Sequence, residues 1–186
     1  ERALKEAGVE REDIDTIAEG LGPGSYAGIR SAIAVAQGWQ LGRQVRLVGL
    51  SSVEVLAAQA QATGVRGPVN FVVDAQRGEL YWARYLIGAA GCERVQPLRL
   101  AGWSDLATVV AQGELLMGPS AGMVERGVKL LMPGASALAV LAAGCDVDMA
   151  PETLEPIYLR ATAFIKAPPA RSIPPGHACS PPAPQS

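Results

Sequence analysis

The sequence predicts an α/β fold. Segments with the composition of strands alternate with segments of helical periodicity up to about residue 60. Residues 69–74 are then apolar almost throughout, as expected for a strand that is covered on both faces. A short turn at residues 76–78 leads into a second strand-like run, residues 79–86, which is rich in aromatic residues. Alternation followed by a hairpin is typical of the α/β class.

The first half of the chain is predicted to hold four regular elements. Apolar side chains at three- and four-residue spacing indicate a helix at residues 27–41. A second helix begins at Ser51, where Glu54 three positions later completes the pattern of a capping box. Short strands are predicted at residues 14–21 and 45–50.

The second half is less regular. Helices are predicted at residues 103–111 and 133–144, and short strands at residues 114–117 and 156–160. From residue 167 onward prolines are frequent and apolar residues are few. Residues 167–186 are therefore expected to form a disordered, solvated tail.

The chain begins in a pattern that is typical of a helix interior. Ala3, Leu4 and Ala7 share one face of this helix, and Gly8 closes it. The first residues include no initiating Met and lack the order of a signal peptide. We therefore expect a natural N-terminal segment ahead of residue 1.

Charge and cysteine content exclude several functional classes. The formal net charge of −2 gives no global attraction to nucleic acid or to an anionic membrane. No uninterrupted apolar run approaches the roughly 18 residues that a membrane span needs. Cys92, Cys145 and Cys179 are odd in number and far apart, which fits neither a disulfide framework nor a zinc site. This usage indicates a reducing cytosol.

The glycine-rich stretch LGPGSYAGIR around Ser25 is the most distinctive part of the sequence. A Walker A loop would need a lysine after the glycines, and a nucleophile elbow would need glycines two residues before and after the serine. Gly22, Gly24 and Ala27 come closer to a dinucleotide fingerprint, but the next strand ends without the acidic residue that binds ribose. The only histidine, His177, lies in the tail, which excludes histidine base catalysis and a histidine zinc site.

Two interpretations of this loop remain. In the first, the glycines turn a strand into a helix, and Ser25 caps that helix. In the second, the helix N-terminus holds a nucleotide phosphate, with Gly22, Gly24, Ser25 and Gly28 as binding residues. Asp74, at the end of a buried strand, is expected to bond backbone N–H groups of its turn, because one carboxylate makes a poor metal site.

Five blocks of the sequence resemble the bacterial TsaB (YeaZ) family. The resemblance spans about residues 3–160, and its first and third blocks are the most specific. Tyr26 and Ala27 stand where the family usually has Phe and Thr, and the family's opening β-hairpin is absent. The blocks are GPGSYAGIRSAIAVAQG, VGLSSVEVLA, VVDAQRGELYWARY, PGASALAVLA and LEPIYLR.

The resemblance implies a fold of the acetate kinase/hexokinase/actin type, built from two ribonuclease-H-like lobes. We expect a first lobe, truncated at its N-terminus, at residues 1–88 and a second, smaller lobe at residues 89–166. The resemblance also implies a cytoplasmic protein without catalytic residues or metal of its own. Its expected role is that of a scaffold for the TsaD transferase in threonylcarbamoyladenosine modification of tRNAs that read ANN codons.

Further partners follow from the same resemblance. A TsaE-like ATPase is expected in the complex, and tRNA is expected to be contacted only indirectly. No intrinsic cofactor is implied, and ATP or ADP is the nucleotide expected at the partner interface. The alternatives are a nucleotide-binding regulatory subunit and a protease acting on TsaD. The protease alternative lacks a histidine base, a metal site and a paired-aspartate motif.

Two helices are predicted to form the partner surface. Residues 31–42 and residues 55–65 contain no charged residue. A helix with two uncharged faces needs two burial partners, and one sheet supplies only one. In the family the matching helices pack against TsaD or a second copy, so we expect a homodimer when the chain is alone. The predicted interface residues are Ala34, Gln37, Gly38, Leu41, Val55, Ala58 and Ala62.

Overall fold

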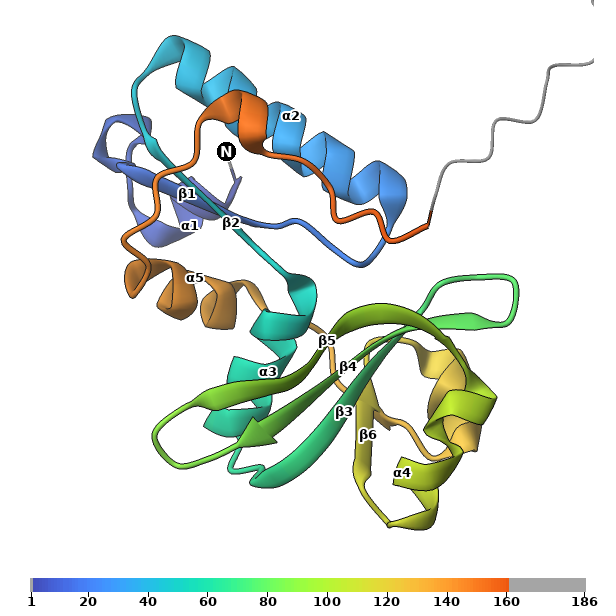
Figure 1. The fold of residues 1–186 in the computed structure, drawn as a ribbon. Helices are drawn as coiled ribbons and strands as arrows, with labels where there is room; N and C mark the ends of the chain where they lie inside the picture. The colour runs from blue at the N-terminus through green and yellow to red at the C-terminus, as the bar shows by residue number, and fades with distance from the viewer. Residues whose placement is uncertain (1, 161–186) are drawn as a thin grey trace, which may run out of the picture.

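The computed structural model describes residues 2–160 and contains two β-sheets (Figure 1). β1 (Thr16–Gly20) and β2 (Arg46–Leu50) form a parallel pair. Together with the long helix α2 (Tyr26–Gly42) this pair is called the first lobe. The second sheet has five strands in the order β5-β4-β3-β6-β7, and with its own helices it is called the second lobe.

The second sheet is built around a hairpin. β3 (Gly67–Asp74) and β4 (Glu79–Ile87) are antiparallel, and β5 (Cys92–Gly102) follows antiparallel to β4. On the other side, β6 (Leu115–Gly118) runs parallel to β3, and β7 (Lys129–Leu130) runs parallel to β6. The expected α/β class is therefore confirmed.

Helices and 3-10 segments cover both faces of the five-stranded sheet. α3 (Ser52–Ala62) covers one face, where Leu56 is fully buried against residues such as Phe71. Because side chains alternate along a strand, the next residue, Val72, faces the other side. That side is covered by α4 and by two 3-10 segments. They span Ala107–Ala111, Trp103–Leu106 and Ala121–Arg126.

The parallel pair of the first lobe is sandwiched in the same way. Ile33 of α2 is buried against Leu47 of β2. α5 (Ala135–Ala143) contacts β1, β2 and α3. Ile17 packs with the α2 cluster, whereas Ala18 lines a cavity with α5, so the two helices lie on opposite faces of the pair.

α3 begins as the sequence predicts. Ser51 Oγ accepts a hydrogen bond from Val53 N at 3.3 Å, and Glu54 Oε2 accepts one from Ser51 N at 3.2 Å. These bonds satisfy backbone donors that the start of a helix otherwise leaves without partners. The predicted capping box is confirmed.

The structure corrects two expectations about strands. The sequence predicts no strand at residues 92–102, yet β5 runs over eleven residues there. Its exposed side chains and Pro97 suit its position at the edge of the sheet. The strand expected at residues 156–160 does not form, because this segment crosses the first lobe with a single backbone bond, Ile157 N to Leu21 O, instead of a ladder.

The lobe boundary also differs from the expectation. The hairpin of β3 and β4 belongs to the five-stranded sheet, so this sheet begins at Gly67 and not at residue 89. The chain later returns to the first lobe, where Met149 N donates to Leu47 O at 2.9 Å. Residues 161–166 of the expected second lobe and the predicted tail lie outside the described residues.

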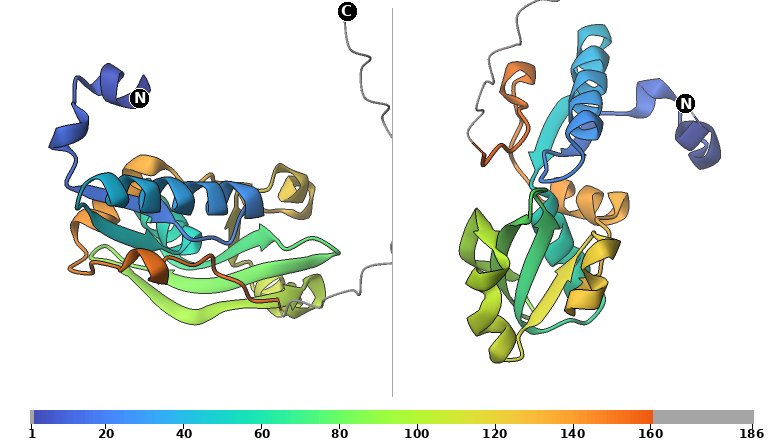
Figure 2. Two further views of the ribbon diagram at one scale, coloured as in Figure 1. Left: turned by 90° about the horizontal axis from the view of Figure 1, so that it is seen from above. Right: turned by 90° about the vertical axis from the view of Figure 1, so that its right-hand side faces the viewer.

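The N-terminal segment stands away from the body of the molecule (Figure 2). α1 (Arg2–Ala7) has no buried residue, and Gly8 ends it with a φ of 65°, as predicted. The 3-10 segment Arg11–Asp13 follows. No helix within residues 2–160 is long and apolar enough to cross a membrane.

Candidate functional site

A cavity of about 550 Å³ opens where strands of both sheets end. Gly20 at the end of β1 and Asp74 at the end of β3 lie on its wall, as does Ser120, two residues beyond β6. Ligands of open α/β folds bind outside the carboxyl ends of parallel strands. This cavity, called the cleft below, is therefore the candidate binding site.

The glycine loop forms one wall of the cleft. Ser25 caps α2, because its Oγ accepts a hydrogen bond from Gly28 N at 3.3 Å. Gly24, Ser25 and Gly28 all line the cleft. Gly22 lies behind the loop, where its carbonyl accepts from Ser52 N at 2.7 Å. Its φ of 102° favours glycine, so it shapes the loop from inside the protein.

The N-terminus of α2 gives this wall a positive character. The first backbone N–H groups of a helix lack partners within the helix, and the helix dipole adds partial positive charge there. Together these features suit an anion such as a phosphate. Three of the four predicted binding residues therefore meet at the cleft, and the loop also serves as the predicted strand-to-helix turn with Ser25 as its cap.

The β3–β4 turn forms the opposite wall. Asp74 Oδ1 accepts from Gln76 N at 2.7 Å, and Asp74 and Gln76 both line the cleft. The expected role of Asp74, bonding a backbone N–H group of its turn, is confirmed. Gln76 and Arg77 hold φ values of 64° and 58°, which non-glycine residues rarely adopt. Residues 2–160 contain no group of three or more His, Cys, Asp or Glu side chains that could hold a metal ion.

Another part of the cleft wall has no signal in the local sequence, and it includes Pro119, Ser120, Met132 and Pro133. Pro119 and Ser120 follow β6, which runs parallel to β3. The rule that ligands bind beyond strand ends could have found them. Glycine is required at position 118, where β6 lies beside β3, because a Cβ there would collide with the carbonyl oxygen of Val72.

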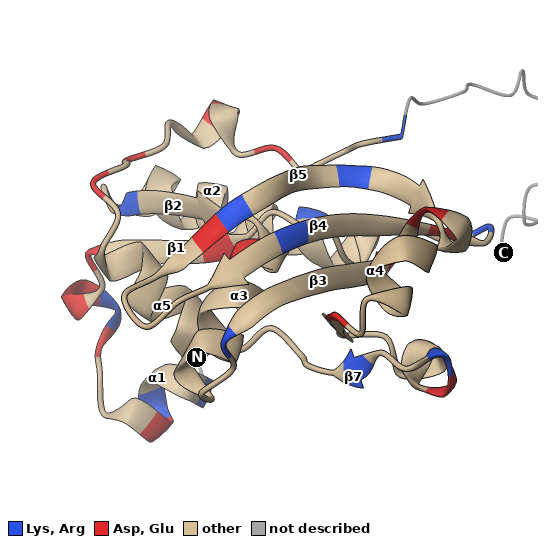
Figure 3. Ribbon diagram, turned by 60° about the horizontal axis from the view of Figure 1, so that its bottom comes forward, with Lys and Arg blue, Asp and Glu red and all other residues tan. Residues whose placement is uncertain are grey.

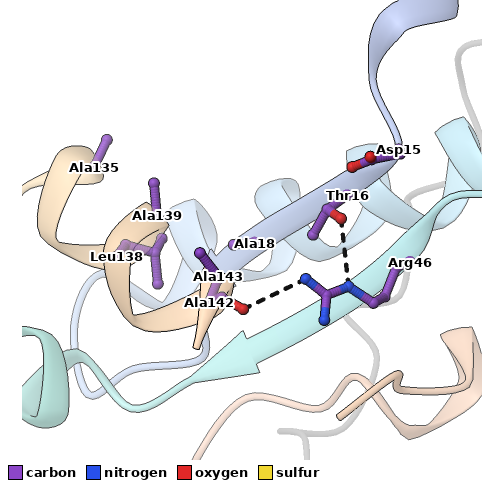
Figure 4. A pocket seen from close by; sticks show the side chains of 9 residues that line it. All are labelled: Asp15, Thr16, Ala18, Arg46, Ala135, Leu138, Ala139, Ala142 and Ala143. Atoms are coloured by element: carbon purple, nitrogen blue, oxygen red, sulfur yellow. Dashed lines mark hydrogen bonds between the residues drawn. The ribbon is translucent and has the colours of Figure 1, made fainter. Parts of the chain in front are cut away.

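A second cavity, of about 520 Å³, lies between β1 and α5 (Figure 4). Arg46 reaches across it, donating from Nε to Thr16 Oγ1 at 3.3 Å. Its terminal nitrogens donate to Cys145 O at 2.7 Å and Ala142 O at 3.4 Å. The guanidinium thus satisfies carbonyls at and just beyond the end of α5, where a cation also complements the helix dipole. We assign Arg46 a structural role.

The second lobe contains a buried polar network. Asn70 is fully buried, accepts from Trp82 Nε1 at 2.9 Å and donates to Glu114 Oε2 at 2.9 Å. Arg84 Nε also donates to Glu114 Oε2, at 2.9 Å. Burial alone would raise the pKa of Glu114, but the hydrogen bonds from Arg84 and Asn70 hold it below its usual value. These hydrogen bonds hold β3, β4 and the loop before β6 together.

Glu19 of β1 is different, because it is buried without a partner. Its side chain is on the face of β1 that packs under α2, between Ile17 and Leu21. It is 6% exposed, and neither carboxyl oxygen has a hydrogen-bond donor among the described residues. Burial therefore raises the pKa of Glu19.

α2 presents an apolar face to solvent. Val35 is 63% exposed and Leu41 is 92% exposed, and the predicted interface residues Ala34 and Gly38 are exposed as well. Gln37 is half-buried, because its Nε2 donates to Pro151 O at 2.7 Å. It is therefore held by the chain itself.

The predicted interface residues on α3 are more buried than those on α2. Val55 is 2% exposed and belongs to the interior, so its side chain is not available to a partner. Ala58 is half-buried and Ala62 is exposed. α3 already has two burial partners within the chain, the five-stranded sheet and α5.

Charged residues lie along β4, β5 and the N-terminal segment, and α5 has none (Figure 3).

The two sheets and the cleft at their strand ends fit a fold of the acetate kinase/hexokinase/actin class, which the matches below support. A family model described as TsaD, tRNA N6-adenosine threonylcarbamoyltransferase, matches residues 1–144. The Escherichia coli tRNA threonylcarbamoyladenosine biosynthesis protein TsaB is 31% identical over 176 residues, which cover 84% of this chain and 75% of that protein. The chain therefore belongs to the TsaB (YeaZ) family.

Other relatives support membership of the same family. A Buchnera aphidicola protein of the same name is 31% identical, over 46% of this chain and 40% of its own length. The structure of YeaZ from Pseudomonas aeruginosa matches with a TM-score of 0.64 and 29% identity, over 84% of this chain and 79% of that one. A Pseudomonas aeruginosa protein described as similar to peptidase YEAZ matches with a TM-score of 0.69 and 28% identity, over 86% and 80%.

Proposed function

We propose that this chain is a non-catalytic scaffold subunit. It supports a TsaD-like transferase in threonylcarbamoyladenosine modification of tRNAs that read ANN codons. The observation that carries the proposal is the exposed apolar face of α2, where Val35 and Leu41 are 63% and 92% exposed. An exposed, uncharged helix surface of this kind suits a protein–protein contact. The Escherichia coli and Buchnera relatives are named as proteins of this biosynthesis, which supports the assignment.

The proposed partner surface is α2 and not α3. Gly38 lies between Val35 and Leu41 along α2, and Ala34 directly precedes Val35. These small residues let a partner helix approach closely. We propose a second copy of the chain as the occupant in isolation and the TsaD-like transferase as the occupant in function, with a TsaE-like ATPase joining the complex. Residues 2–160 contain no histidine, because the only one in the sequence is His177. This supports a role without histidine-based chemistry.

The surface can be tested with one charge. Val35→Glu should weaken association by about 1–3 kcal/mol and leave the fold intact, because the side chain is on the surface. Val124→Glu is the matched control, since Val124 is 48% exposed in the second lobe. Light scattering measures self-association, and a pull-down measures capture of the TsaD-like transferase. If both variants associate as strongly as the unchanged chain does, the interface lies elsewhere.

A second candidate function is nucleotide binding. We propose that ATP or ADP is held at the cleft in the complex, with its phosphates at the N-terminus of α2 beside Gly24, Ser25 and Gly28. Calorimetric titration with ADP, on the chain alone and on the complex, tests this proposal. Ser25→Ala should weaken binding severalfold, because it removes the cap that shapes this helix start. The proposal fails if ADP binds the complex equally well without the serine hydroxyl.

A further inference from the structure

We propose that residues 149–160 form a strap that fixes the two lobes around the cleft, and that Arg160 is the positioning residue at its second-lobe end. The strap contains LEPIYLR, the last of the distinctive sequence blocks, which the proposed scaffold role leaves unexplained. The inference goes beyond that role, because it concerns the geometry of the cleft whatever binds there.

The strap is anchored on the first lobe at several points along its length. Met149 N donates to Leu47 O at 2.9 Å, and Ile157 N donates to Leu21 O at 2.8 Å. Between these bonds, Leu154 is 3% exposed and packs in the core of the first lobe. These contacts hold the segment in place although it is not part of a sheet.

The strap then passes beside the glycine loop. Ile157 is bonded to Leu21, the residue before Gly22. The next strap residue, Tyr158, places its ring 5.8 Å from the ring of Tyr26, the first residue of α2. The strap therefore contacts the glycine loop at both of its ends, and that loop forms one wall of the cleft.

Arg160 carries the strap across to the second lobe. Its Nη2 donates to Ala75 O at 3.1 Å and also pairs with the carboxylate of Glu79. Both acceptors belong to the β3–β4 turn, which forms the opposite wall of the cleft through Asp74 and Gln76. One guanidinium thus connects the end of the strap to the wall that faces the glycine loop.

This turn needs outside support. Gln76 and Arg77 both adopt positive φ, a conformation that persists only where the surroundings enforce it. Asp74 enforces it from within the turn through its bond to Gln76 N. Arg160 holds the same turn from outside, at Ala75 and Glu79. Removing Arg160 should therefore loosen the turn before it affects the rest of the second lobe.

Hydrogen exchange tests the positioning role. The amides of Ala75 and Glu79 close the turn by bonding to Glu79 O and Gln76 O. In Arg160→Ala these two amides should exchange about five- to tenfold faster, while amides in the centre of β3 keep their rates. Glu79→Gln should cause a smaller change, because the bond from Arg160 to the Ala75 carbonyl remains. Arg160→Glu should cause the largest change, since it places two carboxylates together.

Two further measurements separate positioning from a general loss of structure. The double variant Arg160→Glu with Glu79→Arg should recover part of the protection. Spin labels at the exposed Gln44 and Gln112 should report a broader distance distribution between the lobes in Arg160→Ala. Arg99→Ala is the control, because the bonds of Arg99 stay within the second lobe. Unchanged turn amides in Arg160→Ala, or equal broadening in the control, would overturn the proposal.

Discussion

α2 and α3 look alike in sequence and differ in surroundings. Both are rich in alanine, and both contain long stretches without charge. α3 buries Leu56, Ala57 and Ala60 against the five-stranded sheet and has α5 on its other side. α2 buries only Ile33 and Ala36, and leaves Val35 and Leu41 in solvent.

This difference shows what an uncharged helix does and does not indicate. Absence of charge predicts that a helix face is covered, but not whether the cover comes from the same chain. For α3 the cover is internal, so only α2 keeps the open face that a partner needs. The proposed interface therefore narrows from two helices to one.

The largest expected effect contrasts one leucine from each helix. Leu56→Ala should lower the free energy of unfolding by about 2–5 kcal/mol, because Leu56 is fully buried and its loss leaves a cavity. Leu41→Ala should change it by less than about 0.5 kcal/mol in the monomer, since Leu41 is 92% exposed. Urea unfolding at low protein concentration measures both. Similar losses would mean that α2 is covered within the chain, which would contradict the contrast.

A smaller effect concerns the strand under α2. Because burial raises the pKa of Glu19 above its ordinary 4.5, the folded state binds this proton more tightly than the unfolded state. The resulting stability is present below pH 4.5 and is lost as the pH rises through the folded pKa. Glu19→Gln should remove this pH-dependent loss, because the amide does not ionise, so its stability relative to the unchanged chain should rise from pH 4 to pH 8. Urea unfolding between pH 4 and 8 measures it, and parallel pH profiles for the two proteins would show that Glu19 is not buried as described.

Features with local causes could be predicted from the sequence. The capping box of Ser51 and Glu54, the Ser25 cap and the Asp74 turn each depend on residues within three positions of one another. The strands β3 and β4 were predictable because their apolar character is continuous or rich in aromatic residues. The glycine-loop wall of the cleft was predictable because its residues are close together in the sequence.

Features with distant causes could not be predicted. β5 is held as an edge strand by pairing with β4, although its own exposed residues and Pro97 argue against a strand. Ser120 reaches the cleft because β6 pairs with β3 across a long connection, and Met132 is held there by a hydrogen bond from Gln59 Nε2 of α3 to its carbonyl oxygen. The burial of Val55 depends on packing around α3 that no local pattern of the helix indicates.

The most direct test of the account is the affinity of the chain for the TsaD-like transferase from the same source. Sedimentation velocity can compare the unchanged chain with Val35→Glu on α2 and Val124→Glu in the second lobe. The account predicts that the α2 variant raises Kd by about 5- to 150-fold, which corresponds to about 1–3 kcal/mol, and that the control leaves it unchanged. The same Kd for all three proteins would contradict the claim that α2 is the partner surface.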